Sequence, residues 1–134
     1  NGRGTFGKGT TAMSISIPTI DDSRTMRDLL RLTFEEAGFF VTTAEDGADG
    51  VEKLSAANPD VIITDINMPG LDGFEFIGTV RGSGRNASVP ILVLSTENSA
   101  ELKDRARTVG ATGVIVKPFN DTRLVSAIRR VARL

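Results

Sequence analysis

The fold is indicated most directly by one stretch, Pro59-Asp60-Val61-Ile62-Ile63-Thr64-Asp65-Ile66-Asn67-Met68-Pro69-Gly70. Its run of four β-branched residues, 61–64, predicts a short buried strand, and the Pro69-Gly70 pair predicts a turn soon after it. This pattern places the carboxylate of Asp65 at the carboxyl end of the strand. Because ligands bind at that edge of open α/β sheets, Asp65 is the first candidate site residue.

The chain on both sides of this stretch alternates between strand-like and helix-like patterns. Strands are expected over 14–20, 39–43, 60–65, 89–94 and 112–116, and helices over 23–37, 48–57, 73–81, 99–109 and 120–131. Near-continuous apolar strands that alternate with helices predict an α/β fold, a doubly wound five-stranded parallel sheet with helices on both faces. Among the strand orders that right-handed crossovers allow, we expect the flavodoxin-like order 2-1-3-4-5.

The chain is expected to form one domain over residues 13–134. Residues 1–12 are rich in Gly and Thr and cannot bury enough apolar surface to order themselves, so they predict a flexible tail that could be a remnant of cloning. Within this tail, residues 2–8 match the first part of a phosphate-binding P-loop. Gly9 stands where that motif needs Ser or Thr, and no strand precedes it, so we expect no nucleotide site there.

The composition restricts the chemistry that this chain of 134 residues can perform. It has no cysteine, which excludes a disulfide framework, a thiolate zinc site and a thiol nucleophile. It has no histidine, which excludes a Ser-His-Asp triad and imidazole metal ligands. The remaining possibilities depend on carboxylates, hydroxyls, lysine and a bound ion.

Charge and hydropathy indicate no attraction to nucleic acid or to a membrane. The formal net charge is -1, which is too small to steer the protein towards a polyanion. No stretch approaches the roughly 18 apolar residues of a membrane span, and the start lacks the apolar region of a signal peptide. We therefore expect no nucleic-acid or membrane partner and a cytoplasmic location.

Two further acids, Asp21 and Asp22, follow the first predicted strand. In the expected strand order they converge with Asp65, and three carboxylates at one edge repel each other unless a cation lies among them. Mg²⁺ prefers oxygen ligands in an octahedron and keeps several waters. We expect it to be bound by Asp22, Asp65 and the backbone carbonyl of Asn67, with Asp21 acting through a water.

The same edge is expected to carry the groups needed for phosphoryl transfer. Carboxylates form acyl phosphates with phosphoryl donors, so Asp65 is the expected nucleophile. Ser95 follows the fourth predicted strand and Lys117 follows the fifth, which supplies a hydroxyl and a cation for the phosphoryl oxygens. The Lys117-Pro118 bond is a candidate cis peptide.

Four motifs at these strand ends resemble the receiver domains of two-component response regulators, with the stand-alone chemotaxis (CheY-like) type the most similar. They are Asp21-Asp22-Ser23-Arg24-Thr25-Met26-Arg27, residues 65–73, Leu94-Ser95-Thr96-Glu97 and Val116-Lys117-Pro118-Phe119. The resemblance runs from about Ser14 to the end and implies a phosphorylation-dependent signalling switch. A histidine kinase would phosphorylate Asp65 with Mg²⁺ bound, and Ser95 and Lys117 would read the phosphoryl group.

The resemblance also implies the kind of output. The face formed by the fourth helix, fifth strand and fifth helix would exchange protein partners, such as a flagellar motor switch or another target, and a phosphatase could act on the phosphorylated form. The domain would not be an enzyme beyond self-dephosphorylation. Because the sequence stops after the fifth helix, output is expected through a partner protein. Asn67 and Glu97 match positions that tune the phosphate lifetime in the family.

Two departures from the family pattern keep other functions open. Pro18 lies inside a strand expected to be central, where it cannot donate to the ladder, so a bulge or shortened pairing is expected there. Val114 replaces the aromatic residue that many members carry three positions before the lysine. One alternative is a phosphorylation-independent interaction module. The other is a Mg²⁺-dependent phosphohydrolase, although such enzymes usually carry an acid where this chain has Asn67.

Overall fold

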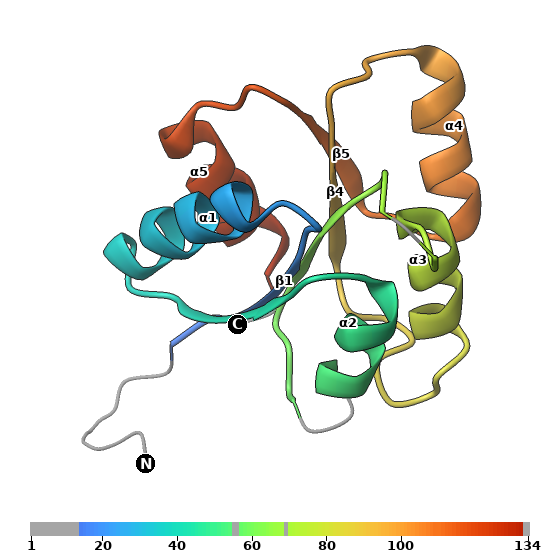
Figure 1. Ribbon diagram of the computed structural model, residues 1–134, viewed down its shortest axis with the longest axis horizontal. Helices are drawn as coiled ribbons and strands as arrows, with labels where there is room; N and C mark the ends of the chain where they lie inside the picture. Colours follow the sequence, from blue (N-terminus) through green and yellow to red (C-terminus); the bar gives the residue numbers. More distant parts are fainter. Residues whose placement is uncertain (1–13, 55–56, 69, 133–134) are drawn as a thin grey trace.

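The computed structural model describes residues 14–54, 57–68 and 70–132, in which strands and helices alternate (Figure 1). The strands are β1 (Ser16–Ile20), β2 (Phe40–Ala44), β3 (Ile62–Asp65), β4 (Ile91–Ser95) and β5 (Gly113–Val116). The helices are α1 (Arg24–Glu36), α2 (Gly47–Leu54), α3 (Gly73–Arg81), α4 (Ala100–Val109) and α5 (Asp121–Val131). The predicted tail 1–12, with its P-loop-like residues 2–8, lies outside the described residues, as do residues 55–56 near the predicted end of the second helix.

The strands form one parallel sheet in the order β2-β1-β3-β4-β5, which confirms the predicted fold class and strand order. Helices α1 and α5 cover one face, and α2, α3 and α4 cover the other (Figure 1). Each face has its own apolar core, and the largest buried side chains are Phe34 on the first face and Phe76 on the second. No helix in the described ranges has both the length and the apolar character needed to cross a bilayer.

Side-chain caps begin four helices close behind strand ends. Ser23, Asp72, Ser99 and Asn120 each accept a hydrogen bond from a backbone N–H in the first turn of α1, α3, α4 and α5 respectively. These caps satisfy backbone donors that the helix itself leaves unpaired. They therefore fix the loops at the carboxyl edge of the sheet.

The pairing of β1 shows how the sheet accommodates Pro18. The register with β2 is continuous from Ser16 to Ile20, so the predicted bulge is absent there. On the other side only Thr19 and Ile20 pair with β3, which confirms the predicted shortening. The backbone N–H of Ser16 donates to the Asp60 carboxylate and its carbonyl accepts from the Asp60 N–H. Since backbone groups alternate along a strand, Pro18 directs its missing donor to this same shortened side.

Two large apolar residues near the amino-terminal half of the sheet are exposed. Leu29 is 43% exposed, and Phe40, at the start of the edge strand β2, is 62% exposed. The helical spacing of α1 includes Leu29, but the buried stripe of α1 is narrower and contains Leu30, Thr33 and Phe34. Phe40 alternates with the buried Val41, so the strand period turns its side chain to solvent.

The start of α3 packs tightly against the end of β3. The Gly73 N–H donates to the Ile66 carbonyl at 2.9 Å. A Cβ atom on Gly73 would lie 2.7 Å from the Ile66 Cα and would also meet the Asp65 carbonyl. Only glycine allows this approach, so the backbone that carries Asp65 is supported directly by the helix.

We therefore expect Gly73→Ala to lower the free energy of unfolding by about 1–3 kcal/mol, because the new methyl group displaces backbone. Gly78, in the same helix, is exposed and has open space around its Cα, so Gly78→Ala should raise the free energy of unfolding by about 0.5–1 kcal/mol. Urea unfolding followed by circular dichroism measures both. Equal effects of the two substitutions would contradict the close packing described for Gly73.

Candidate functional site

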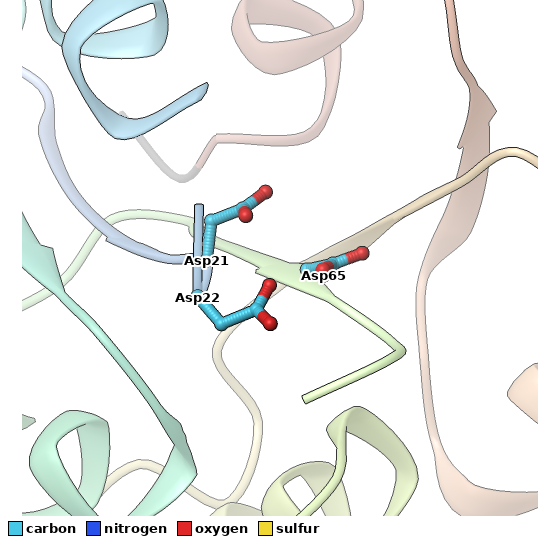
Figure 2. Close-up of side chains that lie close together, drawn as sticks. All are labelled: Asp21, Asp22 and Asp65. Atoms are coloured by element: carbon cyan, nitrogen blue, oxygen red, sulfur yellow. The ribbon is translucent and has the colours of Figure 1, made fainter. Parts of the chain in front are cut away.

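The predicted acids meet where β1 and β3 end (Figure 2). Asp21 and Asp22 follow β1 directly, and Asp65 is the last residue of β3. Because Ile20 pairs with Thr64, the two strand ends lie side by side. Carboxylate oxygens of the three residues lie within 4.8 Å of one another.

Asp21 is held by contacts from four directions. Its backbone N–H donates to the Ala44 carbonyl, and its backbone carbonyl accepts from Nη1 of Arg27 at 2.8 Å. Its Oδ1 accepts from the Ser23 N–H at 2.9 Å, and its Oδ2 lies 3.4 Å from Nζ of Lys117. Its side chain is buried, whereas Asp22 is exposed.

Lys117 joins the acids of both strands. Its ammonium lies 3.4 Å from Asp21 Oδ2 and 3.3 Å from Asp65 Oδ1, and its side chain is only 15% exposed. Its backbone N–H donates to the Ser95 carbonyl at 2.7 Å, a bond that belongs to the last register pair of β4 and β5, Ser95 with Val116. The bond to Pro118 is cis, as the sequence predicted. The ammonium group of Lys117 therefore contacts two of the predicted carboxylates, as expected from the sequence.

The environment of Asp65 disfavours its negative charge. Burial raises the pKa of Asp65 above its ordinary value, and the nearby charge of Asp21 raises it further. The Lys117 ammonium and the Ile66 N–H, which donates to Asp65 Oδ1 at 2.9 Å, lower that pKa but do not outweigh the rise. The balance disfavours the ionised form of Asp65, chiefly because its carboxylate is buried.

Ser95 lies at the same edge and is tied to the start of α4. It is buried and is the last residue of β4, so the strand extends one residue further than predicted. Its Oγ accepts from the Glu97 N–H at 2.9 Å. The Glu97 carboxylate accepts from the Ser99 hydroxyl at 2.7 Å, and Ser99 Oγ caps α4 by accepting from the Leu102 N–H.

The donor set suits a hard divalent cation. Asp21, Asp22 and Asp65 present only oxygen atoms, which Mg²⁺ prefers over nitrogen and sulfur. Three acidic side chains face the one lysine that contacts Asp21 and Asp65, and a divalent cation would offset the remaining negative charge. Asn67 is exposed on the loop after β3, and its carbonyl stays a predicted ligand.

Two contacts of the site were not predicted from the sequence. Arg27 binds the Asp21 carbonyl from α1, and Glu97 links Ser95 to Ser99. The only sequence signal for the first is an arginine in the first turn or two of a helix that begins at the site.

The larger of the two described hollows has a volume of about 290 Å³ and is lined by residues of α2, α3 and the loop before β4. It lies away from the residues of the candidate site. Charged groups at the sheet edge, and not an enclosed apolar cavity, define this site.

Comparisons with known proteins agree with this geometry. The family described as "Response regulator receiver domain" matches residues 17–129. Protein PilG of Pseudomonas aeruginosa is 32% identical over 86% of this chain and 85% of its own length. Response regulator MprA of Mycobacterium tuberculosis is 33% identical over 90% of this chain, which spans about half (52%) of MprA.

A solved structure extends the similarity to three dimensions. The chemotaxis protein CheY4 of Vibrio cholerae superposes with a TM-score of 0.86 at 42% identity, covering 89% of this chain and 99% of CheY4. The strand order, the acids at the ends of β1 and β3 and the family match over most of the sequence all agree. The chain therefore belongs to the response regulator receiver domain family and has the CheY-like fold.

Proposed function

We propose that this protein is a phosphorylation-dependent signalling switch in which Asp65 accepts a phosphoryl group from a histidine kinase in a Mg²⁺-dependent reaction. Receiver domains are signalling switches and generally not enzymes, and the family membership supports that class. The observation that carries the proposal is the cluster of three carboxylates whose members Asp21 and Asp65 also contact Lys117.

The contacts of Asp65 suggest which oxygen reacts. Oδ1 already accepts from Lys117 and from the Ile66 N–H, whereas Oδ2 accepts no hydrogen bond from the described part of the chain. We assign Oδ2 as the nucleophile. It forms a bond to phosphorus as the phosphorus–nitrogen bond of the phosphohistidine breaks, and the electron pair of that bond returns to the histidine nitrogen.

The surrounding residues act on the charge that this transfer brings. A bound Mg²⁺, held by Asp22, Asp65 and the Asn67 carbonyl with Asp21 acting through a water, would neutralise carboxylate and phosphoryl oxygens. Lys117, already 3.3 Å from Asp65, offers a cation to a phosphoryl oxygen, and the Ser95 hydroxyl offers a donor. Phosphorylation adds nearly two negative charges, which favours a different arrangement of these groups.

The output follows as part of the same proposal. The face of α4, β5 and α5 exchanges protein partners when Asp65 is phosphorylated, and a phosphatase resets the domain. The similarity to the Vibrio cholerae chemotaxis protein CheY4 favours a role in chemotaxis, and a flagellar motor switch is one target that we propose. A cytoplasmic location and the absence of nucleic-acid or membrane partners stay predictions from the sequence.

The phosphohydrolase alternative has less support. Asn67 stands where such enzymes usually carry a second acid, so a base for repeated turnover is absent from that position. The interaction-module alternative is disfavoured because the acids and the lysine are assembled and not merely present.

We expect acetyl phosphate with Mg²⁺ to add the mass of one phosphoryl group to the protein, and Asp65→Asn to abolish the gain because it removes the nucleophile. Intact-protein mass spectrometry in Mg²⁺ and in EDTA measures this. Asp72→Asn is the matched control, because Asp72 lies at the same edge but caps α3, a role that Asn also performs. A gain of equal size in Asp65→Asn would refute the assignment.

We also expect Asp65→Asn to raise the melting temperature by a few degrees at neutral pH in EDTA, because the raised pKa means that ionised Asp65 destabilises the folded state. The folded wild type regains this stability as pH falls through the raised pKa of Asp65. The difference between the two proteins should therefore shrink towards pH 4, near the ordinary Asp pKa of 3.8.

Calorimetry from pH 4 to pH 8 follows this difference, and Mg²⁺ added at pH 7 should stabilise the wild type more than Asp65→Asn. A difference that widens as the pH is lowered would show that the Asp65 charge is not the cause. The Asp72→Asn variant again supplies the control for an acid removed from the same edge.

A further inference from the structure

We infer that Arg27 is a positioning residue for the divalent-cation site, because its guanidinium holds the peptide group that joins Asp21 to Asp22. This inference rests on the proposed function, since it concerns the ion that the acids would bind. Arg27 would thus belong to the cation site although its side chain does not bind the ion.

The evidence begins with where β1 stops. The last register pairs of β1 are Ile20 with Ala44 of β2 and Ile20 with Thr64 of β3, so the Asp21 carbonyl lies beyond both ladders. Nη1 of Arg27 donates to this carbonyl at 2.8 Å. A charged donor at this distance makes a stronger hydrogen bond than a neutral one.

The peptide group that Arg27 holds joins the two acids of β1. Asp21 has other anchors, because its Oδ1 accepts from the Ser23 N–H and its Oδ2 contacts Lys117. Asp22 is exposed and its carboxylate makes no hydrogen bond to the described residues. The orientation of the Asp22 side chain therefore depends on the backbone before it, and Arg27 fixes that backbone through the Asp21 carbonyl.

The other arginines of α1 are engaged elsewhere. Arg24 is exposed and lies 4.0 Å from Asp28, and Arg31 pairs with Glu35 at 3.4 Å. Arg27 forms no ion pair with any carboxylate of residues 14–54, 57–68 and 70–132, and its guanidinium donates to a backbone carbonyl instead. Its role is thus distinct from the helix-surface ion pairs of its neighbours.

Electrostatics and positioning predict opposite signs for the loss of Arg27. A positive charge near the acids repels Mg²⁺, so removing it should tighten Mg²⁺ binding if charge alone mattered. If the guanidinium positions Asp22, removing it should weaken binding. Residues that orient metal ligands typically change metal affinity by about 10–100-fold when they are substituted.

The test measures Mg²⁺ binding by isothermal titration calorimetry for wild type, Arg27→Met, Arg27→Lys and Arg24→Met. We expect Arg27→Met to raise the Mg²⁺ dissociation constant about tenfold. Arg24→Met removes the same charge from the same helix and should leave the constant unchanged or slightly lower. Arg27→Lys keeps the charge and a donor, so it should restore most of the affinity.

Binding in Arg27→Met that is as tight as in the wild type, or tighter, would overturn the inference. Circular dichroism in EDTA confirms that each variant is folded, and Arg27→Gln replaces Arg27→Met if the latter is not. Failure of the proposed function is distinguishable, because the wild type itself would then show neither Mg²⁺ binding nor phosphorylation at Asp65. Wild-type activity with an unaffected Arg27→Met would refute only the role of Arg27.

Discussion

The main constraint on this structure is the repulsion between the carboxylates that the fold brings together at one edge of its sheet. Two unit charges about 4 Å apart repel by about 1 kcal/mol in water and by about 4 kcal/mol at the effective dielectric of a protein surface. A domain of this size is stable by only about 5–15 kcal/mol, so such a cluster is a considerable cost. Lys117 offsets part of it by contacting Asp21 and Asp65, and burial together with the nearby charge of Asp21 still raises the pKa of Asp65.

The two apolar cores make this cost tolerable. Residues of α1 and α5 close one face of the sheet, and residues of α2, α3 and α4 close the other, so β1, β3 and β4 are buried between them. The charged residues lie at the ends of these strands, where the backbone is held by short loops and capped helices. The buried middle parts of the strands thus stabilise the fold, and the ends of the strands carry the charged residues of the site.

Most of the fold could be predicted because its signals are local. The apolar strands, the cap at Ser99 and the stop at Gly110 place most element ends within two residues of those predicted, whereas α2 ends at Leu54, before the predicted Ala57. The assembly of Asp21, Asp22 and Asp65 followed from strand order alone. The exposure of Leu29 could not be predicted, since helical spacing does not define the width of a buried stripe, whereas the alternation of strand β2 accounts for the exposed Phe40. The contact of Arg27 with the Asp21 carbonyl depends on a side-chain conformation that no sequence pattern specifies.

The hydroxyl of Ser95 has a consequence for how the domain transmits a change. A serine hydroxyl offers one donor and two acceptor positions, and Ser95 uses an acceptor position for the Glu97 N–H. Its proton stays available for a new oxygen neighbour while the bond to Glu97 is kept. A displacement of Ser95 would therefore also displace Glu97. Because Glu97 is hydrogen-bonded to Ser99, which caps α4, the first turn of α4 would move with it. This chain of hydrogen bonds does not involve position 114. A displacement of Ser95 could therefore reach α4 without an aromatic ring in place of Val114.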